Sequence, residues 1–435
     1  MIPKTVNVRE RMTMRICQTE KFKSETLSLN IVLPLVRKRY LTTLLFSVLC
    51  RGCEKYPTQA QINRLLDHLW GAAFSARDFT VGETQIVGFS SDFVGASYLP
   101  KGGEEILSEM LTLMREVLFC PVLENGLLSS HYVESEKRIL CDAIRAKKNS
   151  PRAYAFERCA EWMHGDDPIG LSALGTVEEV EAVTPEILTA HWKSIVENVC
   201  ISFFYLGSRS AQDVSNALEC VFGETLAGGG EARACTVYAE PLPTRECRRY
   251  GESLPVTQGQ LVMGFRLPSV LSGRRSFIAA LLGEVLGASP VSKLFVNVRE
   301  RLGLCYSCSA FVSRFACAAY ARCGLDAENR EIAEREILNQ ISLLAGGEIS
   351  DLEWEAARTS LCDSVRQSED SPSSIDRANM SRMLAGMPLD ADALIEGFLS
   401  VTRAEVAAMA GELELDTVFF LHPTRAGEED EDEEN

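Results

Sequence analysis

The sequence predicts an α+β protein made of two similar halves, each a mainly antiparallel sheet covered by helices. Alternating apolar residues, typical of half-buried strands, occur in both halves, and segments of helical periodicity lie between them. The order of these segments in the first half recurs in the second, where 263–268 repeats the pattern of 29–34. Such a long internal repeat indicates a duplicated unit in which helices pack on a sheet.

The first half begins with two alternating segments that predict a β-hairpin. Their apolar residues lie at 12–16 and 27–33, with a polar stretch between them. The periodicity then predicts helices, strands and a final strand in this order: helix 40–49, a helix from Thr58 to Gly71, strands 74–79 and 86–93, helices 103–119 and 129–147, and strand 199–206.

The second half follows a segment rich in Gly and Pro, which is typical of a linker. It restarts with a strand, and the order of elements then mirrors the first half: strand 259–267, helix 277–286, a helical stretch from 292 to 303, and strand 305–312. We therefore predict a first domain at 1–226, a linker at 227–250, a second domain at 251–426 and an acidic disordered tail at 427–435.

Composition and charge exclude several classes of function. The 435 residues carry a net charge of −17, and seven consecutive acids lie at 428–434. Basic residues occur only in short clusters, so a nucleic-acid groove is not expected. The longest apolar run, 41–50, is too short to cross a bilayer, and 1–20 contains no signal-peptide core. We expect a cytoplasmic protein with no nucleic-acid or membrane partner.

Fifteen cysteines in a chain with no predicted export signal indicate reduced thiols rather than a disulfide framework. Two CxxC pairs occur, Cys50 with Cys53 and Cys305 with Cys308. The first has no second pair of ligands at zinc-site spacing. The second falls in a predicted strand, where residues three apart face opposite sides and cannot bind one ion together. We interpret both pairs as structural thiols and expect no metal or cofactor.

Three parts of the chain carry a family resemblance: 50–58, 167–170 followed by 174–180, and 286–307, the last being the most specific. They resemble the pitrilysin/insulinase family of metallopeptidases, and more narrowly its non-catalytic YmfF-like branch, named elongation factor P aminopentanol modification-associated. The resemblance covers most of the chain and implies two duplicated metallopeptidase-type α/β-sandwich domains. No residue of the sequence shows a link to elongation factor P.

The same resemblance identifies the zinc site as missing. Active members carry HxxEH on the first long helix, where two His on one helix face bind zinc and the Glu activates water. A Glu from a later helix is the third protein ligand. Alignment on Gly52 places Thr43 and Ser47 at the two His positions, Phe46 at the Glu position and Ala143 at the third ligand. We therefore expect neither zinc nor catalysis from this chain alone.

The remaining acids and histidines near these positions do not replace the site. Glu136 is retained from the family's pattern, but a carboxylate without imidazoles or a base cannot generate a zinc-bound hydroxide. We interpret it as a surface or helix-pairing residue. The histidines are too far apart in sequence to form the motif, and we interpret His68, His131 and His191 as packing or surface residues.

One pair of functional residues is retained in the second half. Active members use an Arg and a Tyr seven residues apart to hold the peptide and to stabilise charge on the attacked carbonyl, and Arg299 and Tyr306 match this spacing. A guanidinium and a phenol hydroxyl are suitable donors near an oxyanion. The alternative interpretation is that Arg299 is a surface charge on a helix and Tyr306 a buried strand aromatic.

The resemblance implies a non-catalytic subunit. In two-chain members one subunit carries zinc, and the other lacks it but completes the chamber, as this chain is expected to do. An extended peptide would add as a strand to a sheet edge, and the partner would be a zinc-bearing paralogous peptidase. The first alternative is a structural scaffold with no peptide-processing role, as in the core subunits of the respiratory cytochrome complex. An enzyme that uses its cysteines is the second alternative, although no nucleophile, base and orienting group can be assembled.

Overall fold

The residues of the chain form two compact units, which are described here one at a time. The computed structural model describes residues 2–99, 105–197, 199–228 and 235–424. The first unit contains the described residues of Met1–Arg145, Ala173–Thr236 and Ser368–Met383, and the second contains those of Ala146–Ser172, Val237–Gln367 and Leu384–Asn435. Each unit therefore takes in a segment from the other half of the chain.

The sequence predicts two continuous domains, at 1–226 and 251–426. These boundaries stay a prediction. Part of the predicted linker, 229–234, and the whole of the acidic tail at 427–435 lie outside the described residues.

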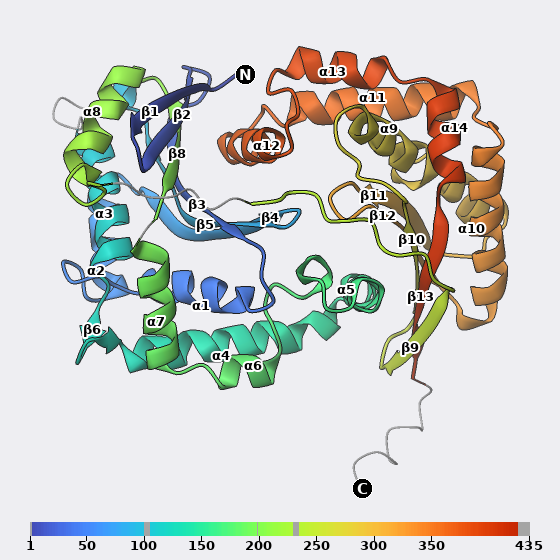
Figure 1. Cartoon of the computed structure of the whole chain (residues 1–435), viewed down its shortest axis with the longest axis horizontal. Helices are drawn as coiled ribbons and strands as arrows, with labels where there is room; N and C mark the ends of the chain where they lie inside the picture. Colours follow the sequence, from blue (N-terminus) through green and yellow to red (C-terminus); the bar gives the residue numbers. More distant parts are fainter. Residues whose placement is uncertain (1, 100–104, 198, 229–234, 425–435) are drawn as a thin grey trace, which may run out of the picture. The chain divides into compact units, whose positions relative to one another are not determined.

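The sheet of the first unit has six strands in the order β1-β2-β8-β3-β5-β4 (Figure 1). All neighbours are antiparallel except β2 and β8, which are parallel. The strands are β1 (Lys4–Arg9), β2 (Met12–Gln18), β3 (Ser24–Pro34), β4 (Ala73–Val81), β5 (Thr84–Val94) and β8 (Ile201–Gly207).

The predicted hairpin of β2 with β3 is wrong, because β8 lies between these two strands. The sequence of β8 is an almost unbroken apolar run whose residues are buried, Phe203 and Phe204 completely so. A strand of this kind is stable in the middle of a sheet, with a neighbour on each side and cover on both faces. The alternating pattern of β2 and β3 correctly predicts which of their residues are buried, but it does not predict which strands they pair with.

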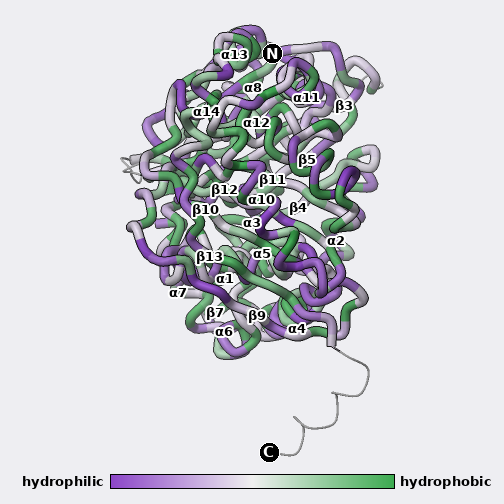
Figure 2. Tube along the Cα trace, turned by 90° about the vertical axis from the view of Figure 1, so that its right-hand side faces the viewer, coloured by the Kyte–Doolittle hydropathy of each residue, from purple (hydrophilic) through white to green (hydrophobic). Residues whose placement is uncertain are grey.

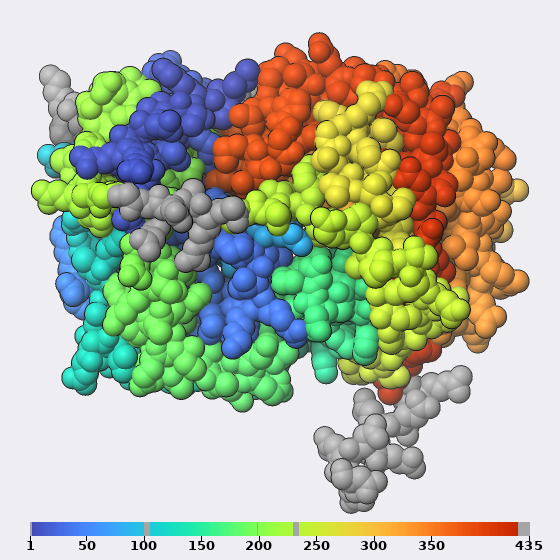
Figure 3. Space-filling view, in the orientation of Figure 1, coloured from blue at the N-terminus to red at the C-terminus, as the bar shows by residue number. Residues whose placement is uncertain are grey.

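Helices of the first unit pack against this sheet around one hydrophobic core, to which α1, α3, α7 and α8 contribute buried residues. Thr58 caps α2 as predicted, since its hydroxyl accepts a hydrogen bond from the Gln61 backbone N–H. Figure 3 shows α8 beside the β1–β2 hairpin, which it also contacts through the ion pair of Arg9 with Glu219. The helices are α1 (Arg39–Leu49), α2 (Gln59–His68), α3 (Ile106–Phe119), α4 (Ser130–Ala146), α6 (Val177–Glu181), α7 (Pro185–Val196), α8 (Ala211–Phe222) and α12 (Pro372–Leu384).

The sheet of the second unit has five strands in the order β11-β12-β10-β13-β9, antiparallel except for the pair β13 and β9. Alternate residues of its strands are buried on opposite faces. Val262 and Phe419 pack in one cluster with residues of α5, while Met263 and Phe420 pack in another with residues of α9, α10 and α14. The strands are β9 (Arg248–Leu254), β10 (Gly259–Arg266), β11 (Ser307–Ser313), β12 (Ala318–Leu325) and β13 (Glu414–Pro423).

Helices cover both faces of this second sheet. The α-helices are α5 (Pro151–His164), α9 (Arg274–Gly283), α10 (Arg330–Ala345), α11 (Asp351–Gln367), α13 (Ala391–Leu399) and α14 (Arg403–Gly411), and two π-helical turns are η5 (Glu284–Ala288) and η6 (Phe295–Arg301). Hydrophobic and hydrophilic stretches are intermixed throughout the trace (Figure 2), as expected of elements with one buried side. No helix in the described ranges is long and apolar enough to cross a membrane.

The two sheets share one topology. Five strands of the first unit, in the order β2-β8-β3-β5-β4, correspond in order and direction to β9-β13-β10-β12-β11 of the second. The repeated patterns at 29–34 and 263–268 begin on the equivalent central strands β3 and β10. The turns that lead into the edge strands β4 and β11 each use a glycine with positive φ, Gly71 at +73° and Gly303 at +61°. The predicted duplicated α+β fold is confirmed.

Candidate functional site

The positions expected to hold the two zinc-binding histidines lie on one face of α1, and hydroxyl residues occupy them. Thr43 and Ser47 are half-buried, four residues apart. The Thr43 hydroxyl hydrogen-bonds to the carboxylate of Asp78 on β4, and the Ser47 hydroxyl donates to the Thr43 carbonyl at 3.1 Å. Gln85 donates to both carboxylate oxygens of Asp78, at 3.1 and 3.2 Å. A hydroxyl, carboxylate and amide cluster therefore occupies the positions at which the sequence predicts a lost metal site.

The position expected to hold the catalytic Glu belongs to the hydrophobic core. Phe46 is 1% exposed, and its ring lies 5.3 Å from that of Phe89 on β5. Phe89 in turn stacks on Phe74 of β4, again at 5.3 Å between ring centroids. A base at this position would have to enter an aromatic cluster that holds no polar partner for it.

The later helix, α4, provides no replacement ligand. Ala143 is exposed, and Asp142 beside it is a surface residue paired with Arg145 at 3.3 Å. Glu136 is buried and forms an ion pair with Arg51 just after α1, so its role is to connect two helices rather than to lie at the surface. Arg51 also donates to Gln59 at 2.7 Å. A buried charge held in this way is a structural group.

Arg299 and Tyr306 lie at the entrance to the edge strand β11 of the second unit. Arg299 is in η6, where its guanidinium lies 4.6 Å from the ring centroid of Phe295 and 3.4 Å from the Glu300 carboxylate. Tyr306 precedes the strand and is 56% exposed. Its hydroxyl donates to Asp326 at 3.1 Å, and this bond to a carboxylate raises the pKa of Tyr306. The alternative interpretation of Tyr306 as a buried strand aromatic is therefore wrong.

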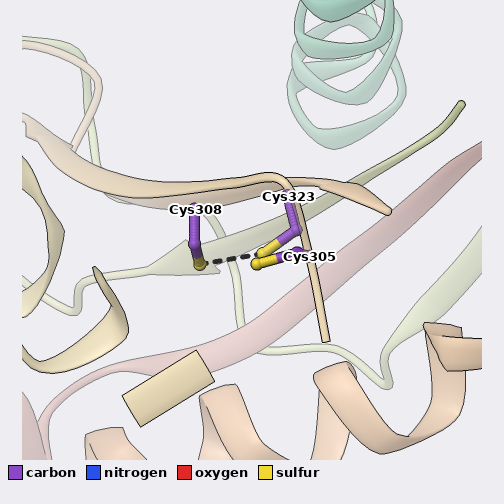
Figure 4. A group of neighbouring side chains, drawn as sticks. All are labelled: Cys305, Cys308 and Cys323. Atoms are coloured by element: carbon purple, nitrogen blue, oxygen red, sulfur yellow. Dashed lines mark hydrogen bonds between the residues drawn. The ribbon is translucent and has the colours of Figure 1, made fainter. Parts of the chain in front are cut away.

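Three cysteines that the sequence does not bring together meet next to Tyr306. The Sγ atoms of Cys305, Cys308 and Cys323 all lie within 4.8 Å of one another, and all three residues are buried (Figure 4). The expectation that Cys305 and Cys308 face opposite sides is wrong, because β11 begins at Ser307 and Cys305 lies in the turn before it. Hydrogen bonds from the other two thiols hold the pKa of Cys305 well below its usual range.

The second unit also contains an open hollow of about 580 Å³ that sequence reasoning did not find. Its wall is formed by residues around the start of α5 and by those from the end of β9 to the start of β10, including Lys148, Arg152, Val256 and Gln260. No motif marks these positions, because the segments are joined by the packing of α5 on the sheet and not by spacing in the chain.

Comparisons with known proteins relate this chain to inactive metallopeptidase homologues. Residues 182–361 match the family model described as the peptidase M16 inactive domain. The chain is 25% identical over 416 residues to "Probable inactive metalloprotease YmfF" of Bacillus subtilis, which covers 95% of this chain and 96% of that protein. By these comparisons the chain is similar to inactive homologues of the M16 peptidases.

Solved structures support the same fold. A conserved protein from Enterococcus faecalis V583 superimposes with a TM-score of 0.90 at 21% identity, covering 98% of this chain and all of that one. A peptidase M16 inactive domain from Pseudomonas fluorescens superimposes with a TM-score of 0.77 at 16% identity, covering 98% and 99% of the two chains. At these identities the likeness concerns the fold alone.

Proposed function

We propose that the chain is a non-catalytic subunit that binds an extended peptide and completes the chamber of a zinc-bearing partner peptidase. The proposal rests on which parts of the family's active site this sequence lacks and which it keeps. The metal and base positions are lost to Thr43, Ser47 and Phe46, whereas the peptide-holding pair Arg299 and Tyr306 is retained. A chain altered in this way can act in peptide hydrolysis only beside a partner that holds HxxEH.

Main-chain groups for an added strand are present at β4. This strand is outermost in the six-stranded sheet and pairs on one side only, with β5, among the described strands. The unpaired N–H and C=O groups of an edge strand can bind an extended peptide. The hydrogen bond of Thr43 with Asp78 joins α1 to β4, so a peptide bound at this edge would lie beside the former zinc position.

The exposure of Arg299 and Tyr306 supports a role toward a substrate held by another chain. The Arg299 side chain is 39% exposed, and the Tyr306 hydroxyl is oriented by Asp326 at 3.1 Å. A permanently charged guanidinium and an oriented hydroxyl are donors of the kind that stabilise a developing oxyanion. A cytoplasmic location belongs to this proposal, because a chain with fifteen cysteines and no predicted disulfide framework suits a reducing compartment.

The proposal is tested in a complex of this chain with the zinc-bearing paralogue from the same genome. Arg299→Ala and Tyr306→Phe should each lower the kcat for peptide hydrolysis by about 10²-fold, the usual effect of removing one oxyanion donor. Arg301→Ala is the matched control, since Arg301 is an exposed arginine in the same turn. Tyr98→Phe is the control for the phenol, since Tyr98 is 57% exposed in the first unit.

The complex must stay intact in each variant, as measured by size-exclusion chromatography with light scattering. If hydrolysis is unchanged by Arg299→Ala and Tyr306→Phe in an intact complex, the peptide-holding role is wrong. The alternative function, a structural scaffold, would then explain the loss of the zinc site without any role in processing.

A further inference from the structure

The three thiols beside Tyr306 converge from different parts of the second unit. Cys305 lies in the turn before β11, Cys308 is within β11, and Cys323 is its direct cross-strand partner on β12. The Sγ atoms of Cys308 and Cys323 are 2.9 Å apart, and that of Cys305 lies within 4.8 Å of both. Figure 4 shows the three sulfur atoms directed at one point.

The backbone explains why the turn brings Cys305 to the strand pair. Gly303 has a φ of +61°, which reverses the chain after η6, and the Tyr306 N–H donates to the Gly324 carbonyl at 2.8 Å. The turn is thereby held against β12 at the residue after Cys323. Since Cys308 and Cys323 are directly opposite each other, their side chains share one face of the sheet.

The cluster differs from the ordinary packing of cysteines elsewhere in this chain. Cys159 and Cys317 are also buried, but their sulfur atoms lie against backbone carbonyls, with Cys317 3.5 Å from that of Ala239. Among the residues that the structure describes, Cys305, Cys308 and Cys323 form the one group of three or more metal-ligating side chains with such close ligand atoms. Convergence of three thiols is not required to fill a core.

We propose that Cys305, Cys308 and Cys323 form a three-thiolate site for a soft, thiophilic metal ion, of which Cu(I) fits best. Thiolates are the ligands that soft ions select. With metal–sulfur distances of about 2.3 Å, a trigonal site separates its sulfur atoms by about 4 Å, within the 4.8 Å that bounds this cluster. The Cys308–Cys323 pair would have to open by about 1 Å to accept the ion.

The choice of ion follows from the number of ligands. Structural zinc takes four protein ligands in a closed tetrahedron, and no fourth Cys, His, Asp or Glu joins this group within the described ranges. The three side chains are 8%, 6% and 2% exposed, so water has little access to an open position. A buried site with three sulfur ligands therefore suits a monovalent soft ion better than zinc. The bound ion would fix the turn that carries Tyr306.

The test is a Cu(I) titration of the reduced, metal-free full chain under nitrogen, in competition with the chelator bathocuproine disulfonate. The background protein carries Cys220→Ser and Cys247→Ser, which remove the two exposed thiols. One tightly bound Cu(I) per chain is expected. Cys305→Ser, Cys308→Ser and Cys323→Ser should each weaken it by more than about 10-fold, since even outer-shell partners contribute that much.

Cys362→Ser is the matched control, because Cys362 is buried in the same unit but lies outside the cluster. Circular dichroism checks the fold of each variant, and Cys305→Ala provides a second substitution without a hydroxyl. Binding that is equal in the cluster variants and in Cys362→Ser would overturn the proposal. A mass lower by two hydrogens, mapped to a Cys308–Cys323 disulfide in protein whose reduced form binds no Cu(I), would instead identify a redox pair and overturn the metal site.

Discussion

The substitution Phe46→Glu restores the base of the family's zinc motif, and we expect it to destabilise the first unit instead of moving toward activity. The Phe46 ring is 1% exposed and packs on Phe89. Removing a buried Phe side chain costs about 3–5 kcal/mol. A carboxyl placed there must stay protonated, and keeping a Glu with an unfolded-state pKa of about 4.3 protonated at pH 7 costs about 1.4 kcal/mol per pH unit, or about 3.7 kcal/mol. The total, on the order of 5 kcal/mol or more, is comparable with the whole stability of a typical domain.

Hydrogen–deuterium exchange measured by mass spectrometry is the suitable assay, because it reads the two units separately within one sample. Peptides from α1 and β5 should lose protection in Phe46→Glu, while peptides from β10 and β13 serve as an internal control. Phe46→Leu should cost less, on the order of 1–2 kcal/mol, because Leu keeps an apolar side chain in the core and leaves only a small cavity. If Phe46→Glu is as well protected as Phe46→Leu, the base position is not part of the core and our explanation of the lost activity is incorrect.

Two further predictions concern buried charge and pH. Asp376 on α12 is 1% exposed and pairs with Arg15 and Arg77, so Asp376→Ala should lower the unfolding free energy of the first unit by about 3–5 kcal/mol, measured by urea denaturation. Burial lowers the pKa of His164, which lies 2.9 Å from the Tyr320 hydroxyl, to about 4. The unfolded chain takes up this proton below about pH 6.5, so stability should fall by about 3 kcal/mol between pH 6.5 and 4, and His164→Gln should remove that part of the loss.

The Asp376→Ala and His164→Gln predictions each have a matched control. Asp370→Ala breaks a surface pair with Lys21, whose side chain is 46% exposed, and should change stability by less than about 1 kcal/mol. Equal effects of Asp376→Ala and Asp370→Ala would contradict the buried ion pair. For pH, His131→Gln replaces an exposed histidine of the first unit and serves as the matched control. A His164→Gln variant with the same acid sensitivity as the unchanged protein would show that His164 is not the group that titrates.

The fold could be predicted largely from local patterns, whereas the partners of each strand could not. Alternation located the central strands β3 and β10, and their repeated sequence predicted the duplication. The same alternation misassigned β2 and β3 as a hairpin, because β8 enters between them from much later in the chain. Periodicity reports which face of a strand is buried, but pairing depends on contacts between distant segments.

Prediction of the candidate site from the sequence was limited in the same way. Helical spacing placed Thr43 and Ser47 on one face of α1, and the structure agrees. The cluster of Cys305 with Cys308 was missed, since a two-residue period was applied to a segment that is a turn, and Cys323 is supplied by the neighbouring strand. The glycine at position 303 is the local signal that could have indicated the turn, because glycine readily adopts the positive φ found there.

The proposal to be tested most directly is that this chain assists the catalysis of a partner and does not perform it alone. The most direct measurement is the zinc content and peptide hydrolysis of the purified chain, first alone and then mixed with its zinc-bearing paralogue. We predict no zinc and no hydrolysis for the chain alone, and a complex in which both metal and activity are present. One zinc per chain together with peptide cleavage by the chain alone would contradict the account and require another active site.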